Sequence, residues 1–152
     1  MVLYVDWHLY DQAVDESLKE LRNGPEDASV YDQIAMVYLI RAQVEKNQQW
    51  VDQAIRYIDK ELATYRGWGD PDPGFALLRA GSALEAAGEI SARQRCTYFH
   101  RAVEVLREAA AASHGDQVIL GEPIPLAPQR TAISKALSRI ESKQGDARCE
   151  FM

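Results

Sequence analysis

The sequence of 152 residues contains few cysteines and no long apolar run. Its two cysteines, Cys96 and Cys149, lie far apart, whereas a small secreted disulfide scaffold carries more cysteines at regular spacings. We therefore expect reduced thiols and a cytoplasmic location, with Cys96 buried in a helix and Cys149 free in a polar tail. A run of about 18 apolar residues is missing, as is the pattern of a signal peptide, so neither membrane nor secretion is expected.

Motifs for catalysis and for metal binding are missing as well. HExxH, CxxC, GxSxG and GxxxxGK[ST] do not occur, and His8, His100 and His114 do not share metal-ligand spacing. Cys96 and His100 stand four residues apart on one predicted helix face, where a thiolate and an imidazole could react together. A packed helix favours a structural role for that pair. We therefore expect no metal, no cofactor and no enzymatic activity.

Positive charge is in short supply. Lys and Arg number 17 against 23 Asp and Glu, which gives a net charge of −6. A protein that binds nucleic acid nonspecifically needs a positive field, and the aromatic residues are not interleaved with basic clusters. Nucleic acid is therefore not an expected partner.

Apolar residues, by contrast, make up 47% of the chain and recur at steps of three and four, the pattern of amphipathic helices. The expected helices cover residues 6–22, 28–47, 50–66, 75–88, 91–113 and 129–143, with Gly88 ending the fourth. Residues 117–120 could form a strand but are too short and isolated for a sheet. The sequence thus predicts an all-α fold of about six helices. One domain spans 1–143, with a loop at 115–128 and a flexible tail at 144–152.

Two predicted helix pairs, 28–66 and 75–113, have the same length of 39 residues and similar spacing. The matching positions are Tyr31, Ile34, Ala35 and Tyr38 in the first pair, and Leu77, Ala80, Gly81 and Leu84 in the second. This spacing resembles the tetratricopeptide repeat in a degenerate form, with Glu61 and Arg95 where the family has alanine. The resemblance implies stacked antiparallel helix pairs in a right-handed superhelix, flanked by 6–22 and 129–143. An ordinary helical bundle is the alternative.

The resemblance also implies an inner groove lined by the first helix of each pair. The residues at the groove positions are Asp32, Gln33, Met36, Leu39, Leu78, Arg79, Ser82 and Glu85. This mixture differs from the lysine- and asparagine-rich groove of chaperone-binding members, so we expect a peptide or partner helix to dock by apolar contact. The expected function is a non-catalytic protein–protein interaction module or scaffold.

Two other functions stay open. Segment 28–47 is apolar around most of its circumference, and a second copy could cover it in a structural homodimer. A small ligand-binding or catalytic bundle is the third possibility, with the proline-rich segment 116–128 as its lid. The row of Lys135, Arg139 and Lys143 on the last helix is expected to face solvent.

Overall fold

The computed structural model describes residues 7–24, 27–68, 73–112, 117–119, 122–124 and 127–149. These residues form six helices and two short strands, so the fold is all-α, as the apolar periodicity predicts. The helices are α1 (Trp7–Asn23), α2 (Ala28–Glu45), α3 (Gln48–Trp68), α4 (Pro73–Ile90), α5 (Arg95–Ala112) and α6 (Ala127–Asp146). The strands are β1 (Gln117–Ile119) and β2 (Glu122–Ile124).

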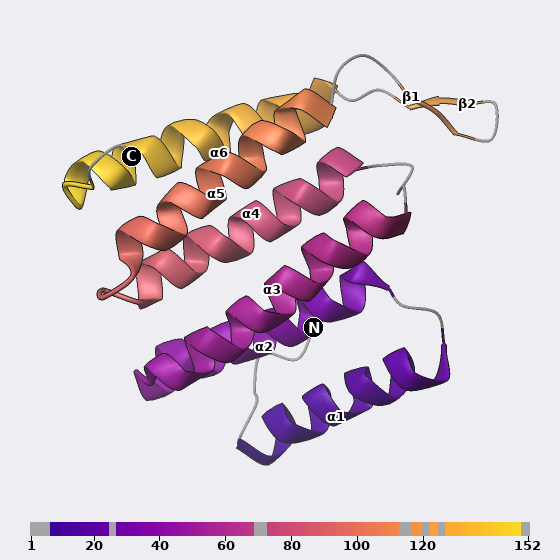
Figure 1. Cartoon of the computed structure of the whole chain (residues 1–152), viewed down its shortest axis with the longest axis vertical. Helices are drawn as coiled ribbons and strands as arrows, with labels where there is room; N and C mark the ends of the chain where they lie inside the picture. The colour runs from indigo at the N-terminus through magenta and orange to yellow at the C-terminus, as the bar shows by residue number, and fades with distance from the viewer. Residues whose placement is uncertain are drawn as a thin grey trace.

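The helices lie in a stack, with α1 at one end and α6 at the other (Figure 1). The most extensive contacts are between α2 and α3 and between α4 and α5, which form two helix pairs. Helix α4 also contacts α2, α3 and α6, while α1 contacts α2 alone among the described elements. Helix α4 is therefore the centre of the molecule.

One large apolar core runs through α2 to α6, and a smaller cluster attaches α1. Leu39, Ile58, Leu84 and Leu106 are almost inaccessible to solvent in the large core. The fully buried members from α6 are Ile133 and Ile140, which lie seven residues apart on one face of that helix. Helix α6 therefore belongs to the core and is more than a cover at its edge.

Helix α1 is held by a polar and aromatic contact in addition to its apolar cluster. Arg41 of α2 donates a hydrogen bond to Asp11 of α1 over 3.0 Å. The same guanidinium lies 3.9 Å from the centroid of the Trp50 ring, and the Tyr38 ring stacks on Trp50 at 5.7 Å. Arg41 thus joins α1, α2 and α3, and its position over an aromatic ring favours its positive charge.

A hydrogen-bond network connects the turns of the two helix pairs. The Ser91 hydroxyl, in a residue that is 2% exposed, donates to the Gln48 side-chain oxygen over 2.7 Å. The Gln48 amide donates to Gln94 over 3.2 Å, and the Tyr98 hydroxyl donates to the same Gln94 oxygen over 2.6 Å. These bonds fix the α2–α3 turn against the segment between α4 and α5.

Small residues in α4 let it approach α5 closely. A Cβ at Gly81 would lie 2.7 Å from the Leu106 side chain, and one at Gly88 would lie 2.6 Å from the Phe99 ring. The prediction that Gly88 ends the fourth helix is wrong, because α4 continues to Ile90. Gly88 is present because the Phe99 ring occupies the space that a side chain would fill.

We expect Gly88→Ala to lower the free energy of unfolding by about 1–3 kcal/mol, because the new methyl group would displace the Phe99 ring. The matched control is Gly145→Ala, since a Cβ at Gly145 of α6 meets nothing within 4 Å. That change should be neutral or stabilise the protein by up to about 1 kcal/mol. Urea denaturation followed by circular dichroism measures both, and equal effects would contradict the close contact.

The expectation that no sheet forms near residue 117 is wrong, although the sheet is small. Strands β1 and β2 pair antiparallel, with Gln117 opposite Ile124 and Val118 opposite Pro123. The prolines of this segment argue against regular structure in the sequence. A proline is nevertheless compatible with a two-stranded ribbon, because each strand has an edge where an N–H is not needed.

The two cysteines form a disulfide, with their Cα atoms 5.3 Å apart, so the expectation of reduced thiols is wrong. Cys96 stands at the start of α5 and Cys149 after the end of α6. The expected tail at 144–152 begins instead with the last turn of α6, and Gln144 is buried. Residues 150–152 lie outside the described residues. None of the described helices is long and apolar enough to cross a membrane.

Candidate functional site

The predicted groove positions lie on α2 and α4, and these two helices are neighbours in the structure. Asp32 of α2 and Arg79 of α4 face each other, with 3.6 Å between a carboxylate oxygen and the guanidinium Nε. Gln33, Met36 and Ser82 are exposed, Leu78 is half-buried, and Leu39 is fully buried in the core. The surface between α2 and α4 therefore presents Gln33, Met36 and Ser82 to solvent.

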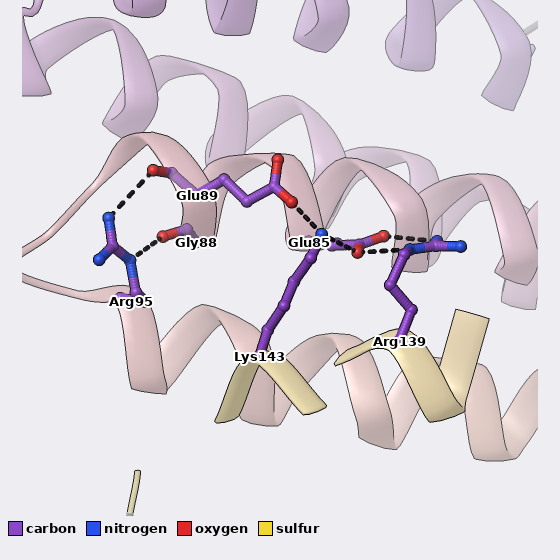
Figure 2. Close-up of polar contacts among 6 residues, drawn as sticks. All are labelled: Glu85, Gly88, Glu89, Arg95, Arg139 and Lys143. Atoms are coloured by element: carbon purple, nitrogen blue, oxygen red, sulfur yellow. Dashed lines mark hydrogen bonds and ion pairs between the residues drawn. The ribbon is translucent and has the colours of Figure 1, made fainter. Parts of the chain in front are cut away.

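Glu85, the remaining groove position, is covered by α6 (Figure 2). Two nitrogens of Arg139 donate to its two carboxylate oxygens over 2.7 Å each, and Lys143 donates over 2.6 Å. Lys143 also pairs with Glu89. Burial raises the pKa of Glu85, but the hydrogen bonds from Arg139 and Lys143 outweigh burial, and the net pKa is lowered.

The expectation that the row of Lys135, Arg139 and Lys143 faces solvent is therefore wrong for Lys143, which is half-buried. Arg139 stays exposed, although it is paired with Glu85. Their partners are carboxylates on α4, more than fifty residues away in sequence, and local spacing does not reveal such partners. Lys135 is exposed.

A buried acidic pair lies where α2, α3 and α4 meet. Arg79 Nε lies 3.4 Å from a carboxylate oxygen of Glu61, a residue that is 1% exposed, and 3.6 Å from Asp32. The other oxygens, Asp32 Oδ1 and Glu61 Oε2, are buried without a hydrogen-bond partner among the described atoms. Burial, followed by the charge of Asp32, raises the pKa of Glu61 to about 9. Glu61 is therefore protonated at neutral pH, and its proton can bond to Asp32.

The sequence contained one sign of this pair. Glu61 follows Ala54 and Ile58 on the apolar face of α3, at a position where the tetratricopeptide pattern has a small residue. A charged side chain at a core position needs a partner or a proton, which marks it for attention. The identity of its partners, Asp32 and Arg79, required the structure.

An exposed apolar stripe runs along α2. Met36, Ile40 and Val44 are spaced four residues apart, and their exposed fractions are 39%, 46% and 60%. Residues four apart on a helix lie on the same side, so the three side chains form one surface. Met36 was among the predicted groove residues, whereas Ile40 and Val44 were not. We call these three residues the α2 stripe.

A pocket of about 460 Å³ opens beyond the groove, at the end of α2 and α4. Its lining is Ala42, Gln43, Lys46, Asn47, Gln48, Val51, Ala86, Glu89 and Ile90. The apolar side chains come from all three helices α2, α3 and α4, and the polar ones are mainly amides. The chemistry of the lining suits the burial of one or two apolar groups with hydrogen bonds at the margin.

The candidate reactive groups of the sequence are occupied by structural contacts. Cys96 is in the disulfide, so its sulfur is not a free thiolate beside His100, in line with the structural role that the packed helix favours. His100 lies 3.2 Å from Glu104, one turn further along α5. Within the described residues, no group of three or more His, Cys, Asp or Glu side chains is placed to hold a metal ion.

No family model, curated protein or solved structure matches this chain. Function therefore has to be argued from the surface of the molecule itself.

The Asp32–Glu61 pair predicts a particular dependence of stability on pH. The pKa of Glu61 is about 9 in the folded state against an ordinary 4.5, so unfolding releases a proton between these values. The free energy of unfolding should therefore fall by up to about 1.4 kcal/mol per pH unit across this window. Glu61→Gln keeps a hydrogen-bond donor and removes the titration, so it should flatten the fall.

Urea titrations at several pH values measure this slope, and Glu85→Gln is the matched control. The pKa of Glu85 is lowered in the folded state, so its contribution is present above pH 4.5 and disappears as the pH falls. Glu85→Gln should therefore weaken acid sensitivity and leave the fall toward pH 9 unchanged. If the free energy of unfolding of Glu61→Gln fell with pH as steeply as that of the unchanged protein, the proton on Glu61 would be excluded as the cause.

Proposed function

We propose that the chain is a non-catalytic protein–protein interaction module, which binds an amphipathic helix of a partner protein on the surface between α2 and α4. The observation that carries the proposal is the α2 stripe. Three large aliphatic side chains on one helix face remain open to solvent, although the same chain buries many others almost completely. Adjacent exposed apolar side chains of this kind are typical of interaction surfaces.

The shape of the surface favours a helical partner. The α2 stripe spans two turns of helix, about 12 Å, which matches apolar residues at i, i+4 and i+7 on a facing helix. The pocket of about 460 Å³ lies where α2 ends and offers space for one further anchor residue. Docking of this kind needs no charged clamp. It is consistent with a groove in which Asp32 is already paired with Arg79 of α4, and Glu85 with Arg139 and Lys143 of α6.

The tetratricopeptide-like superhelix is part of the same proposal. The two helix pairs and the neighbouring positions of their first helices, α2 and α4, support it. In that family the first helices line the surface that binds partners. A cytoplasmic location receives no support from the cysteines, because disulfides are rare in the reducing cytosol.

The test is the binding of helical peptides. Peptides selected against the immobilised protein from a library of amphipathic helices should lose at least about tenfold in affinity for Met36→Glu and for Ile40→Glu, because a charge would be buried in the interface. Ala63→Glu places the same charge at an exposed position of α3 and should bind as well as the unchanged protein. Fluorescence anisotropy gives the dissociation constants of the unchanged protein and the three variants. Equal affinities across all variants would exclude the α2 stripe as the binding surface.

A structural homodimer is the second candidate, and the same stripe favours it. Apolar side chains along one helix can meet their own copies across a two-fold axis. Sedimentation equilibrium over a hundredfold range of protein concentration distinguishes the two candidates. A dimer that Met36→Glu dissociates would support self-assembly, and a monomer throughout would leave the surface to a different protein.

The third candidate, a ligand-binding or catalytic bundle, has no comparable observation in its favour. Its proposed lid, 116–128, is described only at β1, β2 and the first residues of α6.

A further inference from the structure

The Cys96–Cys149 disulfide joins the first turn of α5 to the chain beyond α6. Cys96 is the second residue of α5, and Cys149 follows the last residue of α6 by three positions. The body of α6 has anchors of its own, since Ile133 and Ile140 are buried and Arg139 is bound to Glu85. Opening the disulfide would therefore release the end of α6 while the body of the helix stays in place.

The turn that carries Cys149 has a locally unfavourable backbone. Arg148 has φ 56°, in the left-handed region that is unfavourable for a residue other than glycine. Backbone N–H groups of Ala147, Arg148 and Cys149 bond to carbonyls in the last turn of α6. Gly145 within that last turn adds conformational freedom to the unbound state. Without the cross-link to α5, these backbone hydrogen bonds would have to hold the turn against the cost of the left-handed residue.

The turn also forms one wall of a second pocket, of about 300 Å³. Asp146 lines it from the last turn of α6, Ala147 from the turn that follows, and Phe99 from α5. Lys143 and Glu89 stand at its edge, and Arg95 caps the end of α4 by donating to the carbonyls of Gly88 and Glu89, at 3.0 and 3.1 Å (Figure 2). The Phe99 residue is itself 2% exposed.

We propose that this disulfide is a redox latch, which keeps the turn at residues 147–149 closed against the first turn of α5 when oxidised and lets it open when reduced. The reductant is a dithiol. Its thiolate attacks Cys149 Sγ, the bond between the two sulfurs breaks, and Cys96 leaves as a thiolate that takes up a proton. The second thiol of the reductant then displaces Cys149, which is protonated in turn, and the reductant becomes a cyclic disulfide. Two electrons and two protons pass to the protein.

Two features of the structure favour this reaction. Both cysteine residues are partly exposed rather than sealed in the core, which favours the approach of a small dithiol. Cys96 lies in the first turn of α5, where the positive end of the helix dipole stabilises a thiolate and makes Cys96 the better leaving group.

Hydrogen exchange of the intact chain, with and without dithiothreitol and without denaturant, tests the latch. Reduction is verified by the mass gain of two hydrogens. We expect the exchange rate of the amides at 144–149 to rise by on the order of tenfold or more, with the amides at 129–140 nearly unchanged. Cys149→Ser should show the fast pattern with or without the reductant. Ser142→Ala, at an exposed position of α6, should respond like the unchanged protein.

Three results would overturn the proposal. The first is a disulfide that dithiothreitol does not reduce in the folded protein. The second is unchanged exchange at 144–149 after verified reduction. The third is a loss of protection throughout α6, because the disulfide would then be a staple for the whole helix.

Discussion

The close approach of α4 and α5 is the contact on which the rest of the structure depends. It is possible because α4 has no side chain at Gly81 and Gly88, where Leu106 and Phe99 of α5 fill the space. With α5 this near, the opposite sides of α4 are free to contact α2, α3 and α6 at the same time. Dense packing of this kind makes the interior sensitive to a single added methyl group.

Helix α4 also supplies the polar connections to both sides of the stack. Arg79 reaches the carboxyl groups of Asp32 and Glu61, and Glu85 receives Arg139 and Lys143 from α6. A buried ion pair contributes less than its Coulomb energy, because both groups lose water. Its value lies in orientation, since a shifted helix would leave a charge buried without a partner. The contacts of Arg79 and of Glu85 thus favour the observed arrangement of the helices over other arrangements that would bury the same apolar area.

The periodicity of apolar residues was enough to predict the six helices and the core. Ile133 and Ile140, for example, recur at helical spacing within the predicted helix 129–143 and are fully buried. Local spacing carries no information on distant partners, however. Lys143 was expected in solvent and Cys149 was expected to be free. Their partners, Glu85 and Cys96, lie far from them in the sequence, so neither contact could be predicted from local spacing. The short β1–β2 ribbon was not predicted because Pro123 lacks an N–H for pairing within a sheet. A proline is nevertheless tolerated at the edge of a strand.

For the candidate site, the sequence indicated Met36 and Asp32. It did not indicate that Ile40 and Val44 would stay exposed while Glu85 became covered.

The disulfide has a topological consequence. Between Cys96 and Cys149 the chain is a closed covalent ring that contains α5, the β1–β2 ribbon and α6. A protease that cuts inside the ring cannot separate the fragments, so a nick in the ribbon leaves α6 attached to the body of the protein. The ring also keeps α6 with its own chain, because the exchange of this helix between two copies would require the ring to be broken first.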